Sequence, residues 1–360
     1  MVRLLSALQR LGCRLAEPGE FARRAFDNGK IDLAEAEGIA DLIEAETEAQ
    51  RVQALRQASG ELSRLYEGWR EELIGAMALM EAGIDFSDEA DVARDAIEQA
   101  RLVARDLASR IAAHLDDGRR GEILRDGFRV VLAGAPNAGK SSLLNALARR
   151  DAAIVSDEPG TTRDVIEVRL DLEGLPVIVS DTAGIRDATL EAIGAIETEG
   201  IRRSFEQGRM ADLVLWVVDR AAPRWEVPRA LQEAPFEMVL NKVDIADASV
   251  LALQEARARG VLCVSARSGD GIERLVNLIT ARADARIGLR EAPALTQARH
   301  RAGLEACVSA LQDALAQDVL SPELAAEDLR RGASALGRIT GRVDPEDVLD
   351  QVFGRFCIGK

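Results

Sequence analysis

Residues 134–142 read Gly-Ala-Pro-Asn-Ala-Gly-Lys-Ser-Ser and fit the pattern G-x-x-x-x-G-K-S. In such a loop, glycines let backbone N–H groups turn toward an anion, and a helix N-terminus after it favours negative charge. The loop would therefore cradle a polyphosphate. The Lys140 ammonium would reach the β- and γ-phosphates, and the Ser141 hydroxyl would help to hold Mg²⁺. The alternative is a glycine-rich turn with no ligand.

The sequence on either side supplies the elements that must position this loop. An apolar run at residues 128–133 precedes it, and Leu143, Leu144 and Leu147 follow at helical spacing. A strand would thus deliver the turn onto the first turn of a helix, which is the context that the motif requires.

Two further motifs would complete the Mg²⁺ and γ-phosphate side of the site. Asp181-Thr182-Ala183-Gly184 follows the apolar residues 177–179, so the Asp181 carboxylate would lie at a strand's carboxyl end and hold a water on Mg²⁺. Gly160-Thr161-Thr162-Arg163 lies between the first helix and an alternating run at residues 165–172. A loop there would place the Thr162 hydroxyl on Mg²⁺.

Two motifs nearer the C-terminus point to the base. Asn241-Lys242-Val243-Asp244 follows the apolar residues 238–240. A carboxylate there accepts from two donors on one edge of guanine, a pair that adenine lacks. Ser265-Ala266-Arg267 follows residues 261–264 and would close over the base. Together, the five motifs in this order predict a guanine-nucleotide-binding domain.

Composition limits what else the chain does. It has 360 residues, enough for two or three domains, and only 3% are aromatic, which favours Leu/Ala-packed helices. No apolar stretch is long enough to span a membrane, and the start has no signal-peptide layout, so we expect a cytoplasmic protein. Scattered cysteines fit a reducing compartment. The net charge of −15 favours RNA being held through a partner subunit.

Helical patterns flank the predicted nucleotide domain on both sides. Before it, helices are expected at residues 4–15, 22–28, 32–82 and 92–114, with Asp32 as an N-cap. A charged linker to residue 126 follows. After it, Ser321-Pro322 and Asp344-Pro345 each predict a helix start. Both sets carry apolar stripes that need cover. The predicted fold is α/β plus all-α, with a Ras-like P-loop G domain inserted into a discontinuous helical bundle.

Hydrolysis needs a positioned water and positive charge between the β- and γ-phosphates. Ras-like enzymes orient the water with a Gln after Asp-x-x-Gly, but Ile185 stands there in this chain. An acid further along must then serve, and Glu191, a few residues beyond that motif, is the candidate. Its alternative is an exposed Glu at a helix N-terminus. The predicted catalytic residues are therefore Glu191, Lys140 and Asp181.

The chain resembles the MnmE family, also called TrmE, of tRNA-modification GTPases. The resemblance covers essentially the whole chain. It rests on the nucleotide motifs above, on Pro18-Gly19-Glu20-Phe21 with Arg24-Ala25-Phe26, and most specifically on the terminal Cys357-Ile358-Gly359-Lys360.

That resemblance implies a partner and a pathway. Family members work with MnmG, an FAD- and NADH-dependent subunit, in a heterotetramer. Together they install a carboxymethylaminomethyl or aminomethyl group at C5 of the wobble uridine of tRNA, using one carbon from a tetrahydrofolate. Their G domains form a homodimer in the transition state, and K⁺ takes the place of an arginine finger. None of this involves a membrane.

The resemblance also implies roles for individual residues. K⁺ would be bound by Asn137, Ser156, Glu158 and Thr161, and Mg²⁺ by Ser141 and Thr162. Glu191 would act through a bridging water, and Lys30 and Lys360 would contact folate. The full set expected around GTP is Asn137, Ala138, Gly139, Lys140, Ser141, Ser142, Ser156, Asp157, Glu158, Pro159, Gly160, Thr161, Thr162, Asp181, Thr182, Ala183, Gly184, Asn241, Lys242, Val243, Asp244, Ser265, Ala266 and Arg267.

The expected domains are residues 1–20, a remnant of the family's N-terminal folate-binding domain; 21–126 and 289–360, two parts of the helical domain; and 127–288, the G domain. Because most of that folate pocket would lie upstream, folate binding is an open question at this point. Cys357 is either a group near the folate or a small apolar residue beside Phe356.

Two other functions compete with this interpretation. A regulatory GTPase of ribosome assembly would bind ribosomal RNA directly and usually carries a basic domain, which the acidic balance disfavours. A helical scaffold with a degenerate pocket is disfavoured by intact Lys140, Ser141, Asp181 and Asp244.

Overall fold

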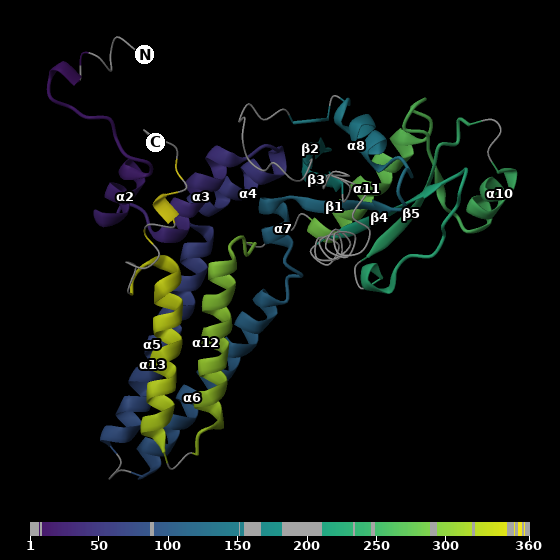
Figure 1. Ribbon diagram of the computed structural model, residues 1–360. Coiled ribbons are helices and arrows are strands. Elements are labelled where there is room, and N and C mark those ends of the chain that lie inside the picture. The colour runs from purple at the N-terminus through teal and green to yellow at the C-terminus, as the bar shows by residue number, and fades with distance from the viewer. Residues whose placement is uncertain are drawn as a thin grey trace, which may run out of the picture. The chain divides into compact units, whose positions relative to one another are not determined.

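The computed structural model describes residues 7, 9–86, 90–150, 152–154, 167–181, 211–232, 235–245, 249–288, 294–318, 321–343, 349, 352–354 and 356. The chain divides into two compact units (Figure 1). We call residues 1–45, 50–122 and 290–360 the helical unit, and residues 46–49 and 123–289 the nucleotide unit. The predicted fold class is confirmed, because the helical unit is built from both sides of an inserted α/β domain.

The nucleotide unit is built on a six-stranded sheet in the order β2-β3-β1-β4-β5-β6. Only β2 runs antiparallel to its neighbour, β3. The strands are β1 (Phe128–Gly134), β2 (Glu167–Leu172), β3 (Leu175–Asp181), β4 (Leu213–Asp219), β5 (Phe236–Asn241) and β6 (Leu262–Cys263). The parallel strands β1, β3, β4, β5 and β6 all end at one edge of the sheet. The phosphate loop follows β1, Asp181 ends β3, Asn241 ends β5, and Ser265 comes shortly after β6.

Helices cover both faces of this sheet. On one face, α8 (Lys140–Ala148) and α11 (Ile272–Ile287) pack on alternate residues of β1 such as Val130 and Leu132. On the other face, α10 (Val250–Ala258) packs with Val131 and Ala133. A short 3-10 turn, η2 (Arg229–Leu231), joins this second core. Burial on both faces explains why the central strands are continuous apolar runs.

The helical unit contains four long helices that pack side by side, α5 (Glu61–Asp85), α6 (Ala90–Leu115), α12 (Ala298–Ala316) and α13 (Pro322–Thr340) (Figure 1). Their core takes one stripe from each helix, including Leu73, Ile111, Leu311 and Leu336. Smaller helices precede them: α2 (Glu20–Asp27), α3 (Leu33–Glu44) and α4 (Glu48–Ala58). Of the described residues, none belongs to a helix long and apolar enough to cross a membrane.

Three expectations about helices were wrong. The tract at residues 32–82 is three helices, because Ala45 leaves helical geometry and Gly60 adopts φ 81°. Residues 11–17 are not helical: Gly12 has φ 87°, and the Leu11 and Leu15 side chains, which a helix would have to bury, lie exposed. The charged linker contains a helix, α7 (Arg120–Asp126). Residues 123–126 of it join the nucleotide unit, ahead of the expected start at 127.

A buried polar cluster joins the two halves of the helical unit. The Glu37 carboxylate accepts from the Arg299 guanidinium at 2.9 and 3.1 Å and lies 2.7 Å from His300 Nε2. Arg299 also donates to the Arg338 and Ile339 carbonyls at the end of α13. We call Glu37, Arg299 and His300 the helical clasp. It ties α3 to α12, which follows the inserted domain in sequence.

Candidate functional site

The phosphate loop runs from the end of β1 to the start of α8, and two glycines make its path possible. Gly134 has φ 152°, and a Cβ there would lie 2.3 Å from the Val217 carbonyl oxygen. Gly139 has φ 89°, and a Cβ there would lie 2.4 Å from the Asn241 side-chain nitrogen. A side chain at either position would clash with these neighbours, so the path of the loop requires glycine at both 134 and 139.

Lys140 and Ser141 open helix α8, whose first N–H groups have no partner within the helix. Lys140 Nζ donates to the Gly134 and Ala135 carbonyls, both at 3.2 Å, so the ammonium lies over the loop. Ser141 Oγ donates to Asp181 Oδ2 at 2.5 Å. The two residues predicted to serve Mg²⁺ from different motifs therefore meet.

This pair of oxygens suits Mg²⁺. A hydroxyl and a carboxylate are hard ligands, and Mg²⁺ is usually held by one or two such groups together with phosphate oxygens and water. The Ser141 hydroxyl and the Asp181 carboxylate converge at the helix N-terminus, where the predicted phosphates would lie.

The base side of the site is held to the phosphate loop by Asn241, which is 1% exposed. Its amide nitrogen donates to the Ala138 carbonyl at 3.0 Å, and its amide oxygen accepts from Ala266 N at 3.2 Å. Lys242, with φ 64°, donates to the Asn137 carbonyl at 2.6 Å. Three sequence motifs are thereby fixed to one another.

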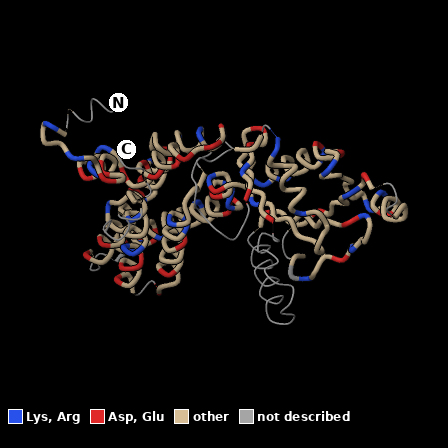
Figure 2. Tube along the Cα trace, turned by 45° about the horizontal axis from the view of Figure 1, so that its top comes forward, with Lys and Arg blue, Asp and Glu red and all other residues tan. Residues whose placement is uncertain are grey.

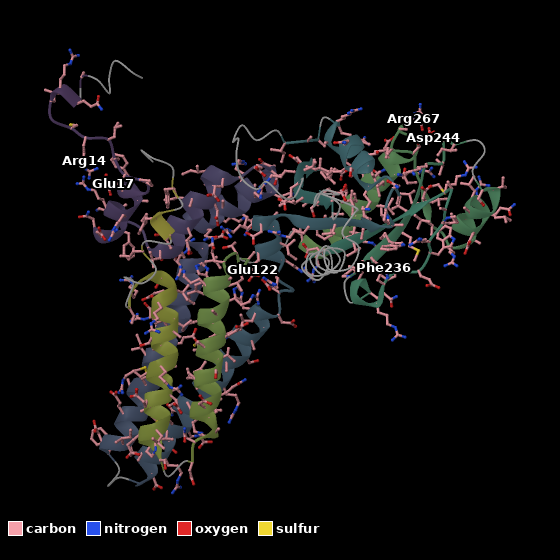
Figure 3. The ribbon with its side chains drawn as sticks, viewed as in Figure 1. Arg14, Glu17, Glu122, Phe236, Asp244 and Arg267 are labelled. Atoms are coloured by element: carbon pink, nitrogen blue, oxygen red, sulfur yellow. The ribbon has the colours of Figure 1, made fainter. Side chains whose placement is uncertain are left out.

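Asp244 is exposed at this edge and close to the Ser265 loop. Ser265 Oγ donates to Asp244 Oδ1 at 2.7 Å and accepts from the backbone N–H groups of Arg267 and Ser268. Figure 3 shows Asp244 and Arg267 at the same corner of the nucleotide unit. The Ser265 hydrogen bond is the main cause that lowers the pKa of the Asp244 carboxyl, and the Arg267 charge adds to it. Asp244 is therefore an ionised acceptor.

The prediction missed Asp219, which accepts from Lys242 Nζ at 2.7 Å. Lys242 is thus held between this carboxylate and the phosphate loop. The signal was present in the sequence: Asp219 ends a buried strand at the carboxyl edge, as Asp181 does.

The remaining predicted residues divide into three groups. Ser142 lies in α8, and Val243 lies in the base loop. Lys30 is exposed in the helical unit, in the turn between α2 and α3. Outside the described residues lie Ser156, Asp157, Glu158, Pro159, Gly160, Thr161, Thr162, Thr182, Ala183, Gly184, Ile185, Glu191, Cys357 and Lys360.

Comparison with known proteins decides the family. A family model described as the MnmE helical domain matches residues 33–357. The chain belongs to the MnmE family. The tRNA modification GTPase MnmE of Parvibaculum lavamentivorans is 53% identical over 362 aligned residues, covering 100% of this chain and 79% of that protein. Its counterpart in Maricaulis maris is 52% identical, covering 99% and 79%. As an MnmE-family protein with a Ras-like nucleotide unit, the chain is a GTPase.

Proposed function

We propose that this MnmE-family GTPase is K⁺-dependent and acts with an FAD- and NADH-dependent MnmG-like subunit to modify C5 of the tRNA wobble uridine. The observation that supports it most is that Ser141 meets Asp181 and Ser265 meets Asp244 at one sheet edge. The chain that carries this arrangement is about half identical to relatives named tRNA modification GTPase.

For guanine selection, we propose that the Asp244 carboxylate accepts from the ring N–H and the amino group of the base. Ser265 donates to only one oxygen of that carboxylate, which has further acceptor sites. The Lys242 ammonium donates to the Asn137 carbonyl and to the Asp219 carboxylate, and we propose that the side-chain stem fixed in this way contacts a face of the base.

For hydrolysis, we propose that Lys140 binds the β- and γ-phosphates and that Ser141, with Thr162, holds Mg²⁺, with Asp181 behind it. When bound, Mg²⁺ would neutralise charge that develops on the phosphates. Lys140 already lies over the loop, so it would exchange two carbonyl partners for phosphate oxygens.

For the alkali cation, we propose that Asn137 supplies an amide oxygen, with Ser156, Glu158 and Thr161 completing the set. Asn137 is exposed in the phosphate loop with φ 61°, and its carbonyl is fixed by Lys242. The test is GTP turnover in K⁺ and in Na⁺ at equal ionic strength. Faster turnover in K⁺ that Asn137→Ala abolishes supports the proposal, and equal rates in both salts would remove the cation from the mechanism.

For the attacking water, we propose Glu191, acting through a second water. Glu191→Ala should keep GTP affinity and lose most turnover, and Glu191→Gln should behave similarly because the amide is a poorer acceptor. Turnover that survives in both variants would assign the water to another group.

For the pathway, we propose that tRNA is held mainly through the flavoprotein, and that the protein works in the cytoplasm. Figure 2 shows acidic and basic residues interspersed along the described parts of both units. Neither this mixing nor the net charge of −15 indicates a basic face that would hold RNA directly. A pull-down in K⁺ with GDP and aluminium fluoride should yield a dimer through the G domains and capture the flavoprotein. Direct capture of ribosomal RNA instead would favour a role in ribosome assembly.

For folate, we propose that Lys30 and Lys360 contact a tetrahydrofolate from one side. Phe356 lies in the same apolar cluster as Phe26 and Ile31, so the chain is brought close to Lys30 shortly before Lys360. Calorimetric titration with a tetrahydrofolate, repeated with Lys30→Ala, tests this. Affinity that does not depend on Lys30 would contradict it.

A further inference from the structure

One buried arginine lies directly after β4, behind the base loop. Arg220 is 6% exposed, although arginines are mostly found at the surface. Its Nη1 donates to the Val243 carbonyl at 2.7 Å and to the Ile245 carbonyl at 2.9 Å, and its Nε donates to the Ser249 carbonyl at 3.4 Å. The first two carbonyls flank Asp244 on its two sides in sequence.

On the β6 side, the backbone pairing reaches this loop through the Val243 N–H, which donates to the Val264 carbonyl at 3.2 Å, but on the β4 side it does not. The β4–β5 ladder ends at Asp219 and Asn241, and the next residue, Lys242, has a positive φ. The backbone of Arg220 donates to the Asn241 carbonyl at 3.2 Å, just where the ladder stops. Arg220 therefore continues the contact between β4 and the base loop with its side chain.

The loop that contains Ser265 is held differently. Ser265 accepts from Arg267 N and Ser268 N through its own hydroxyl, and its backbone bonds to Asp270 and Gly269. That loop is fixed mainly from within. The Asp244 loop has two backbone bonds, from Val243 N to the Val264 carbonyl and from Ile245 N to the Lys242 carbonyl. The carbonyls of Val243 and Ile245 accept from Arg220, whose planar fork lysine lacks.

We propose that Arg220 is a positioning residue for guanine selectivity, holding the Asp244 backbone so that its carboxylate meets both donors of the base. This inference rests on the proposed guanine recognition by Asp244. Arg220 touches neither nucleotide nor phosphate in this scheme. Its positive charge also favours the ionised Asp244 carboxyl, after the stronger effects of Ser265 and Arg267 on that pKa.

The test compares the affinities of the full chain for GDP and IDP. IDP lacks the 2-amino group, so Asp244 accepts one hydrogen bond instead of two, and the phosphates cancel in the ratio of dissociation constants. Arg220→Met keeps the apolar stem and removes the donors. We expect the GDP preference over IDP to fall by about tenfold in Arg220→Met, and by less in Arg220→Lys.

Two matched variants complete the experiment. Arg282→Ala removes an arginine that pairs with Glu237 in the same unit, and should keep the wild-type ratio. Asp244→Asn should remove the preference, and adding Arg220→Met to it should change the ratio no further, because both residues act through one carboxylate.

The outcomes separate this inference from the function it rests on. An unchanged ratio in Arg220→Met, or an equal loss of GDP and IDP affinity, would overturn the positioning role while leaving guanine recognition intact. If Arg220→Met does not fold, the GDP-to-IDP affinity ratio of Arg220→Lys takes its place: a reduced GDP preference supports the positioning role, and an unchanged one overturns it. A wild-type protein without a GDP preference, or an Asp244→Asn variant that retains it, would overturn guanine recognition by Asp244 and this inference with it.

Discussion

Buried polar side chains do different work in the two units. In the nucleotide unit, Asn241 and Ser265 bond largely to loop backbone and leave the Asp244 carboxylate at the surface. In the helical unit, the polar groups of Glu37 and His300 are buried and face each other. The first arrangement presents groups to a ligand, and the second joins chain segments. Burial of polar groups alone therefore does not mark a binding site in this protein.

The largest effect should come from breaking the helical clasp. Glu37→Ala leaves the Arg299 and His300 side chains without their shared carboxylate, and loss of one partner of a buried ion pair costs about 3–5 kcal/mol. Trp69 lies in the helical core, whereas Trp216 and Trp225 belong to the nucleotide unit. In a Trp216→Phe, Trp225→Phe background, urea unfolding followed by Trp69 fluorescence measures the loss. An unaltered midpoint would contradict it, and GDP affinity should not change.

The next largest effect should be a loss of turnover without a loss of stability. Lys140→Ala removes the ammonium expected at the phosphates, and GTP turnover should fall by about 10²–10³. The Trp69 unfolding transition should stay in place, because Lys140 belongs to the nucleotide unit, where it donates to the Gly134 and Ala135 carbonyls. A shift in that transition would mean that the two polar systems are not separate.

A pH titration of unfolding tests the Glu37 carboxylate of the helical clasp without removing it. Burial raises the pKa of the Glu37 carboxyl, but the neighbouring His300 and Arg299 outweigh it and lower the pKa from 4.5 to about 2. Because the folded state binds this proton less readily, its contribution to stability is full above pH 4.5 and is lost as pH falls toward 2. The Trp69 unfolding free energy should therefore decline between about pH 5 and about pH 2, and less steeply in Glu37→Gln. Parallel declines in both proteins would contradict this.

The smallest effect should come from removing the N-cap of α3. Asp32 accepts from Glu35 N, and the Glu35 carboxylate accepts from Asp32 N, both at 2.8 Å, which forms a capping box at the start of α3. Asp32→Ala should lower the unfolding free energy of the helical unit by about 1 kcal/mol. Glu44→Ala, an exposed change at the other end of α3, is the control and should stay within about 0.5 kcal/mol. Equal effects of the two would rule out the cap.

Features formed by residues close together in the sequence could be predicted, and features formed by distant residues could not. The Asp32 N-cap and the phosphate loop are local, so their residues lie within a few positions of one another and were predicted. The helical clasp joins Glu37 to His300 across the inserted domain, and no local pattern connects them. The break at Gly60 was missed because the apolar stripe continues through it at helical spacing. Arg220 was missed because an arginine after a strand ordinarily lies in solvent.

The measurement that tests the account most directly is the rate of hydrolysis of GTP, ATP and XTP by the wild-type protein and by Asp244→Asn. If the Asp244 carboxylate selects the base, the wild type will hydrolyse GTP well ahead of ATP, and Asp244→Asn will shift the preference to XTP, whose 2-oxo group accepts where guanine donates. Equal use of GTP and ATP by the wild type would contradict the account.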